Sequence, residues 1–154
     1  MKFLFIHQLV GGLDEQGRGG VEAASLYEWG GHNADGSDSF SANRPGWASP
    51  IHQLLIQNKV NIVFHGHDHL NAKQGLDGIV YQEVPQPGFP GNNRSRRSPT
   101  EESYCSGTIL SSSGYLRVKV SPDGATVEYA KTPSPAAGAA ISETVAHRYT
   151  TFSR

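Results

Sequence analysis

Residues 60–69 read VNIVFHGHDH, and this stretch decides how the rest of the chain is interpreted. Residues 60–65 are rich in β-branched and aromatic side chains, which is typical of a β-strand covered on both faces. The strand runs directly into a turn, Gly66-His67-Asp68-His69. In open α/β sheets, ligands bind beyond the carboxyl ends of the strands. The stretch therefore predicts a buried strand followed by a ligand-binding turn.

A second strand and a helix are predicted upstream of this turn. Residues 3–6 form another apolar run, typical of a strand covered on both faces, and it ends at His7. Ser49 and Pro50 are a favourable helix start, with Ser as the N-cap and Pro at the first helical position, and we expect the helix to end near Lys59. Strand, helix and strand then form a crossover unit with two parallel strands, so the fold class is α/β.

The rest of the chain predicts further strands and long loops. Between His7 and Ser49 the sequence is rich in glycine, and a connection of this length is uncommon unless it binds something. Tyr115 to Val120 alternates in polarity and is followed by a Pro-Asp-Gly turn, which predicts a β-hairpin. The remaining predictions are a short helix within 21–29, a strand at 79–84, a loop at 85–107, the second hairpin strand at 126–129, a loose linker at 132–140 and a final strand at 145–152.

Composition narrows the class of protein. The 154 residues carry 13 Lys and Arg against 14 Asp and Glu, a net charge of -1, which does not favour nucleic acid or an anionic membrane as a partner. A single cysteine, Cys105, excludes an internal disulfide and a multi-cysteine zinc site, and is most simply a small buried or loop residue. The mean hydropathy of -0.45 and the lack of a long apolar run predict a soluble protein. The N-terminal apolar run is cut by His7 and Gln8, so we expect a strand there and not a signal peptide, and the compartment stays unknown.

The histidines carry the candidate chemistry. If the two strands are neighbours, His7 and His67 leave the same edge of the sheet and can bind one cation. His69 points in a different direction and can bind a second metal, and Gly66 lets the backbone come close to the site. The alternative is that His67 and His69 cap backbone groups in the turn, and that His7 is a hydrogen-bonded core residue.

These residues resemble motifs of the calcineurin-like metallophosphoesterase superfamily. In that family a lone His ends one strand and a Gly-His-x-His motif follows a later one. Segments 5–12, 27–31 and 63–69 are similar to a bacterial branch of it. The resemblance implies a sandwich of mixed β-sheets with flanking helices, and two divalent ions such as Mn, Fe or Zn. It also implies that His7 and His67 share one ion, that His69 binds the other, and that the substrate is a phosphate mono- or diester.

The sequence departs from the family in its acidic motifs. The Asp-x-His, Gly-Asp-x-x-Asp and Gly-Asn-His-Asp/Glu motifs of the family do not occur, and Gly91-Asn92-Asn93 lacks the histidine. We therefore expect a C-terminal portion of the domain without its N-terminal half, with the metal-ligand region in residues 1–84 and a loop and edge hairpin in 85–154. Neutral imidazoles alone cannot bridge two ions, so one ion or none is expected in this chain alone.

Two functions stay open at this stage. The first is a metal-dependent phosphoesterase, and the alternative is a catalytically silent structural or interaction module with a partial histidine site. No catalytic residue is identified. A truncated half would expose a sheet edge, which predicts self-association or pairing with the missing half.

Other polar residues near the motif have two interpretations each. His65 is expected to face packed side chains, and Asp68 to set the turn or to orient a histidine. His32, with Asn33, Asp35 and Asp38, belongs either to a substrate loop or to a solvated turn. The same choice, phosphate clamp or solvated loop, applies to Arg94, Arg96 and Arg97.

Overall fold

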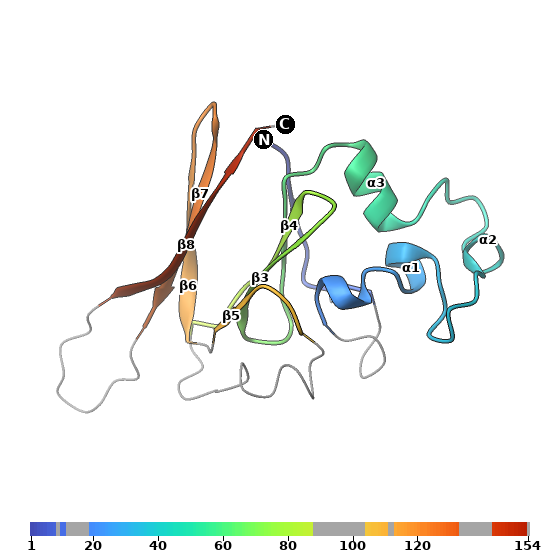
Figure 1. The fold of residues 1–154 in the computed structure, drawn as a ribbon, viewed down its shortest axis with the longest axis horizontal. Helices are drawn as coiled ribbons and strands as arrows, with labels where there is room; N and C mark the ends of the chain where they lie inside the picture. The colour runs from blue at the N-terminus through green and yellow to red at the C-terminus, as the bar shows by residue number, and fades with distance from the viewer. Residues whose placement is uncertain (9, 12–18, 88–103, 111–112, 133–142, 154) are drawn as a thin grey trace.

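The chain folds into two β-sheets and a group of short helices (Figure 1). The structure is a computed structural model and describes residues 1–8, 10–11, 19–87, 104–110, 113–132 and 143–153. A five-stranded sheet lies between a three-stranded sheet and the helices, so each of its faces is packed against another layer. This mixed α/β arrangement of two sheets is compatible with the sandwich that the sequence predicts.

The five-stranded sheet contains the predicted parallel strands. β1 is parallel to β2, and β2 is parallel to β4, so the carboxyl ends of all three lie at one edge. β3 is antiparallel to both β4 and β5. The strands, in their order across the sheet, are β1 (Phe3–Phe5), β2 (Ile62–His65), β4 (Ile79–Glu83), β3 (Asn71–Leu76) and β5 (Thr108–Leu110).

β3 was not predicted, and its turn shows why the chain forms it. Its sequence, NAKQGL, has neither an apolar run nor a regular alternation. The strand is specified by the following Asp77 and Gly78, which have φ of 48° and 73° and join β3 to β4 where Leu76 pairs with Ile79. An Asp-Gly pair with two positive φ angles is a common two-residue hairpin turn.

β1 packs on both faces as predicted, Leu4 on the core beneath the helices and Phe3 against the three-stranded sheet, but its last residue is exposed. It lies at the edge of the sheet, where the described residues pair it with β2 alone. Its last residue, Phe5, is 70% exposed and stacks on Phe64 at 4.9 Å between ring centroids. Self-association through this edge stays a prediction.

The helices are short, and one of them, Phe40–Asn43, lies outside the segments predicted to be helical. α3 (Ile51–Gln57) begins after Pro50, which is the N-cap, whereas Ser49 donates its hydroxyl hydrogen to the carbonyl oxygen of Ala48. The prediction of a Ser49 cap is therefore wrong, because the hydroxyl group is used locally. The glycine-rich segment contains η1 (Val21–Ala23), α1 (Tyr27–Gly30) and α2 (Phe40–Asn43).

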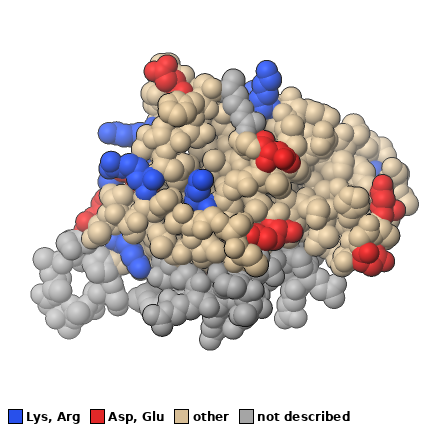
Figure 2. Space-filling model, in the orientation of Figure 1, with Lys and Arg blue, Asp and Glu red and all other residues tan. Residues whose placement is uncertain are grey.

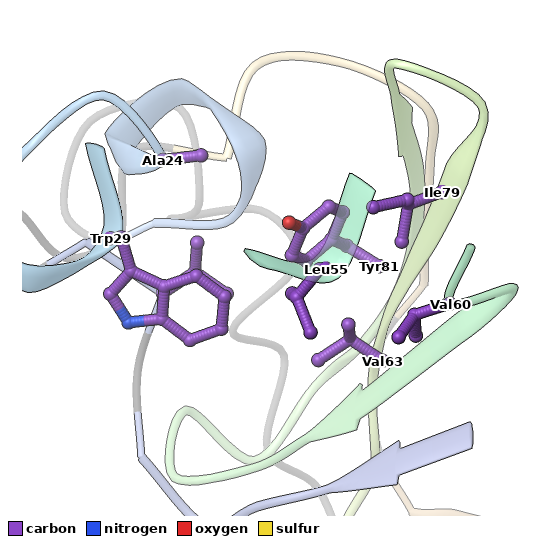
Figure 3. Close-up of a cluster of buried hydrophobic side chains, with 8 residues drawn as sticks. Ala24, Trp29, Leu55, Val60, Val63, Ile79 and Tyr81 are labelled. Atoms are coloured by element: carbon purple, nitrogen blue, oxygen red, sulfur yellow. The ribbon is translucent and has the colours of Figure 1, made fainter. Parts of the chain in front are cut away.

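One hydrophobic core joins η1, α1 and α3 to the five-stranded sheet (Figure 3). Trp29 of α1 lies edge-on to Tyr81 of β4, with ring centroids 6.0 Å apart. The hydroxyl group of Tyr81 lies 2.6 Å from Nδ1 of His52, whose Nε2 lies 2.9 Å from Asp77. The contacts of His52 with Tyr81 and Asp77 therefore connect α3 to the β3–β4 hairpin. The buried members of this core are Val10, Ala24, Trp29, Leu55, Val60, Val63, Ile79 and Tyr81.

The opposite face of the five-stranded sheet packs on the second sheet. That sheet is an antiparallel meander of β6 (Gly114–Val120), β7 (Gly124–Lys131) and β8 (Thr144–Phe152). Its strands confirm the predicted hairpin and the predicted final strand. Residues buried between the sheets include Ile62, Phe64 and Val127. The predicted linker at 132–140 and most of the predicted 85–107 loop lie outside the described residues.

On the face shown in Figure 2, acidic and basic side chains are scattered without a continuous patch of either sign. Among the described residues, no helix is long and apolar enough to cross a membrane.

Candidate metal centre

His7 and His67 come together because β1 and β2 are parallel neighbours. Phe5 pairs with Phe64 in the ladder, and the amide of Ile6 donates a hydrogen bond to the carbonyl oxygen of Phe64 at 2.9 Å. The two chains therefore leave the sheet side by side. The imidazole rings of His7 and His67 follow, with centroids 5.6 Å apart and an angle of 47° between their planes. Both residues are exposed, so the pair is open to solvent.

The turn after β2 has an unusual backbone. His67 and His69 adopt φ of 108° and 58°, a region that residues with a Cβ rarely occupy. Such conformations cost of order 1–3 kcal/mol each and persist only where surrounding contacts enforce them. A Cβ built on Gly66 would lie 3.5 Å from Nδ1 of His7, an ordinary contact distance. Glycine at this position is therefore not required by space, but it leaves that side of the His7 ring uncovered.

An open pocket of about 390 Å³ lies over this edge of the sheet. Four of the seven histidines of the chain line it, so imidazole is its dominant polar group. The side facing the sheets is apolar, with Phe5, Phe64 and Val84 in the lining. The lining histidines are His7, His65, His67 and His69.

A buried polar cluster lies beneath the turn. His65 and Glu83 are paired across β2 and β4, which places Nδ1 of His65 2.7 Å from Oε2 of Glu83. This pair is close enough for an ion pair, although its alignment does not meet hydrogen-bond geometry. Tyr104 donates its hydroxyl hydrogen to Oδ2 of Asp68 at 3.1 Å, and its oxygen lies 3.5 Å from Oε2 of Glu83. These four side chains are at most 1% exposed.

Burial dominates the electrostatics of Glu83. Removing the carboxyl group from water raises its pKa, and nearby Asp68 adds to that effect, while His65 and the amide of Asp68 oppose it. A buried carboxylate without partners would be strongly unfavourable. The amide of Asp68, the Tyr104 hydroxyl group and the His65 ring therefore provide polar partners for the buried carboxyl group of Glu83.

The predicted site residues fall into three groups. His7, His67 and His69 line one pocket, and Asp68 is buried with Oδ1 3.6 Å from Nδ1 of His67. His65 is buried among packed side chains, as predicted.

The second group does not reach the pocket. His32 forms β-bridges with Leu26 and Asp38, and its neighbours form a hydrogen-bonded turn in which Ser37 donates to Asp35. Neither His32 nor these neighbours line the pocket, which favours the interpretation as a solvated turn. Cys105 is exposed in a loop. The third group, Arg94, Arg96 and Arg97, lies outside the described residues, as does the Gly91-Asn92-Asn93 segment.

Sequence reasoning missed Glu83 and Tyr104. Glu83 closes the buried run of β4, and a carboxylate at the end of such a strand indicates a partner, because acidic side chains are almost never fully buried unless paired. Tyr104 lies within the predicted 85–107 loop and had no comparable signal. Glu83 and Tyr104 are distant from Asp68 in the sequence and contact the turn only in the folded protein.

The residues present fit a single metal ion better than a pair. Imidazole is a good ligand for Zn²⁺, Fe²⁺ and Cu²⁺. Within the described ranges, no group of three or more His, Cys, Asp or Glu side chains is placed to hold a metal ion. The nearest carboxylates, Asp68 and Glu83, are buried and already bonded. The described residues thus offer no bridging carboxylate for a second ion.

No family model matches the sequence, and no curated protein matches it either.

Proposed function

We propose that His7 and His67 bind one divalent transition metal ion in a site for the hydrolysis of phosphate mono- or diesters. The observation that supports this most strongly is the convergence of the two imidazoles at the carboxyl ends of adjacent parallel strands, over an open pocket. This is where open α/β sheets place their ligand sites. The resemblance of His7 and of the Gly66–His69 turn to the metallophosphoesterase motifs supports the reaction class.

Each side chain has a distinct part in the proposed site. His7 and His67 hold the ion, and the carboxylate of Asp68, beside Nδ1 of His67, favours an orientation in which Nε2 faces outward. Phe5 and Phe64 stack on each other and form an apolar part of the pocket lining. The metal, when bound, polarises a phosphoryl oxygen and lowers the pKa of water.

Acidic ligands have to complete the site for efficient hydrolysis. A pair of imidazoles leaves the charge of a divalent ion unbalanced, and the family resemblance assigns this role to carboxylates. We propose that they come from another chain, through self-association or pairing with a chain that carries the missing half. His69 would serve a second ion only in such a completed site.

A second function is favoured by one observation. The described residues lack any three-ligand cluster, which fits a catalytically silent structural or interaction module that retains a partial histidine site. Activity separates the two functions.

Hydrolysis of p-nitrophenyl phosphate and of its bis ester, with Mn²⁺ or Zn²⁺ added, tests the proposal. We expect metal-dependent release of p-nitrophenol that is lost in His67→Ala, because this substitution removes a ligand. His147→Ala, in β8 of the other sheet, is the control and should retain the wild-type rate. No turnover with any divalent ion would contradict the hydrolase and leave the silent module.

A further inference from the structure

The His67 turn does not adopt its conformation on its own. Two of its residues, His67 and His69, have positive φ, and neither is a glycine or an asparagine that would tolerate this at low cost. A free chain would therefore relax to other backbone angles and move the His67 ring away from His7. Some contact outside the turn has to hold it.

Glu83 supplies the contact that fixes the middle of the turn. Its Oε1 accepts a hydrogen bond from the amide of Asp68 at 3.0 Å, on the residue between the two strained histidines. Glu83 ends β4, and its side chain is fully buried. The anchor is therefore part of the rigid sheet, and the hydrogen bond is shielded from competing water.

The other oxygen of Glu83 and the Asp68 carboxylate are fixed by Tyr104. The Tyr104 hydroxyl group lies between Oδ2 of Asp68 and Oε2 of Glu83, at 3.1 Å and 3.5 Å. Nδ1 of His65 also lies near this oxygen of Glu83, Oε2, at 2.7 Å. Asp68, whose carboxylate lies beside His67, is thus held both through its backbone amide, by Glu83, and through its carboxylate, by Tyr104.

We infer that Glu83 and Tyr104 are positioning residues that hold the His67 ring next to His7. Neither residue lines the pocket. They act through Asp68, and without them the pair of imidazoles opens. The consequence for metal affinity rests on the proposed function, whereas the effect on the ring pair does not.

Three substitutions separate positioning from general stability. Glu83→Ala removes the acceptor for the Asp68 amide, whereas Glu83→Gln keeps an oxygen that can accept this hydrogen bond. Tyr104→Phe removes only the hydroxyl group. The matched control is Glu22→Gln, because Glu22 also accepts a backbone amide hydrogen bond, from Cys105 at 2.9 Å, and does not line the pocket.

The test measures ring contacts and zinc binding by NMR on the whole chain. In the metal-free wild type we expect NOEs between the ring protons of His7 and His67, and on addition of Zn²⁺ a shift of both rings. Glu83→Ala should lose the NOEs and bind Zn²⁺ about tenfold more weakly, the size typical of outer-shell partners. Tyr104→Phe should weaken the NOEs and the affinity less, while Glu83→Gln and Glu22→Gln should resemble the wild type.

The outcomes distinguish the two claims. Unchanged ring NOEs in a folded Glu83→Ala would overturn the positioning role, whether or not zinc binds. If Glu83→Ala does not fold, unchanged NOEs in Tyr104→Phe would overturn it instead. If the NOEs are lost as expected but the wild-type rings do not respond to Zn²⁺, positioning stands and the proposed metal function fails.

Discussion

Alanine at position 7 or 67 is expected to weaken Zn²⁺ binding at least about tenfold, a loss of about 1.4 kcal/mol in binding free energy. Each substitution leaves only one imidazole of the pair whose rings lie 5.6 Å apart. The double variant should bind more weakly than either single variant, because it also removes the imidazole that each single variant keeps. Isothermal titration calorimetry with Zn²⁺ measures all three.

His69→Ala and His147→Ala complete this experiment. Since the described residues offer ligands for one ion only, His69→Ala should change the affinity less than either member of the pair. His147→Ala lies in the other sheet and should bind as the wild type does. A loss in His69→Ala as large as that in His67→Ala would contradict a site built on His7 and His67 alone.

Gly107→Ala is expected to destabilise the fold by about 3 kcal/mol, whereas Gly36→Ala should cost about 1 kcal/mol. The two glycines have almost the same φ, 83° and 82°, so the backbone strain of alanine is matched. They differ in space: a Cβ on Gly107 would lie 2.2 Å from the carbonyl oxygen of Lys73 in β3, whereas Gly36 has nothing within 4 Å. The difference therefore reports the steric clash.

Urea denaturation of both variants measures this difference. Gly107 leads into β5, so the clash would disturb the pairing of β5 with β3. Equal free energies of unfolding for Gly107→Ala and Gly36→Ala would show that the carbonyl oxygen of Lys73 does not crowd position 107.

The parallel strands and the histidine pair were predictable because their signals are local. The apolar run before His67 and the one before His7 each predict a strand, and a helix between them requires a parallel crossover. If the two strands are neighbours or next neighbours in the sheet, the two histidines leave it at the same edge. The exposure of Phe5 was not predictable, since an apolar strand has the same sequence pattern at an edge as in the centre.

The support beneath the site depends on contacts that the sequence does not display. Glu83 lies beside His65 because of the β2–β4 register, and Tyr104 reaches Asp68 from 36 residues away along the chain. The β3 strand was missed for a different reason. Its signal was the Asp77-Gly78 turn, which is readable from sequence, and not the polarity of the strand itself.

The central claim is that His7 and His67 hold one metal ion, and the metal content of the purified chain tests it most directly. Elemental mass spectrometry of protein purified without chelator should find about one transition metal ion per chain in the wild type, and none in the His7→Ala/His67→Ala double variant. No metal in the wild type, or equal metal in both proteins, would contradict the claim.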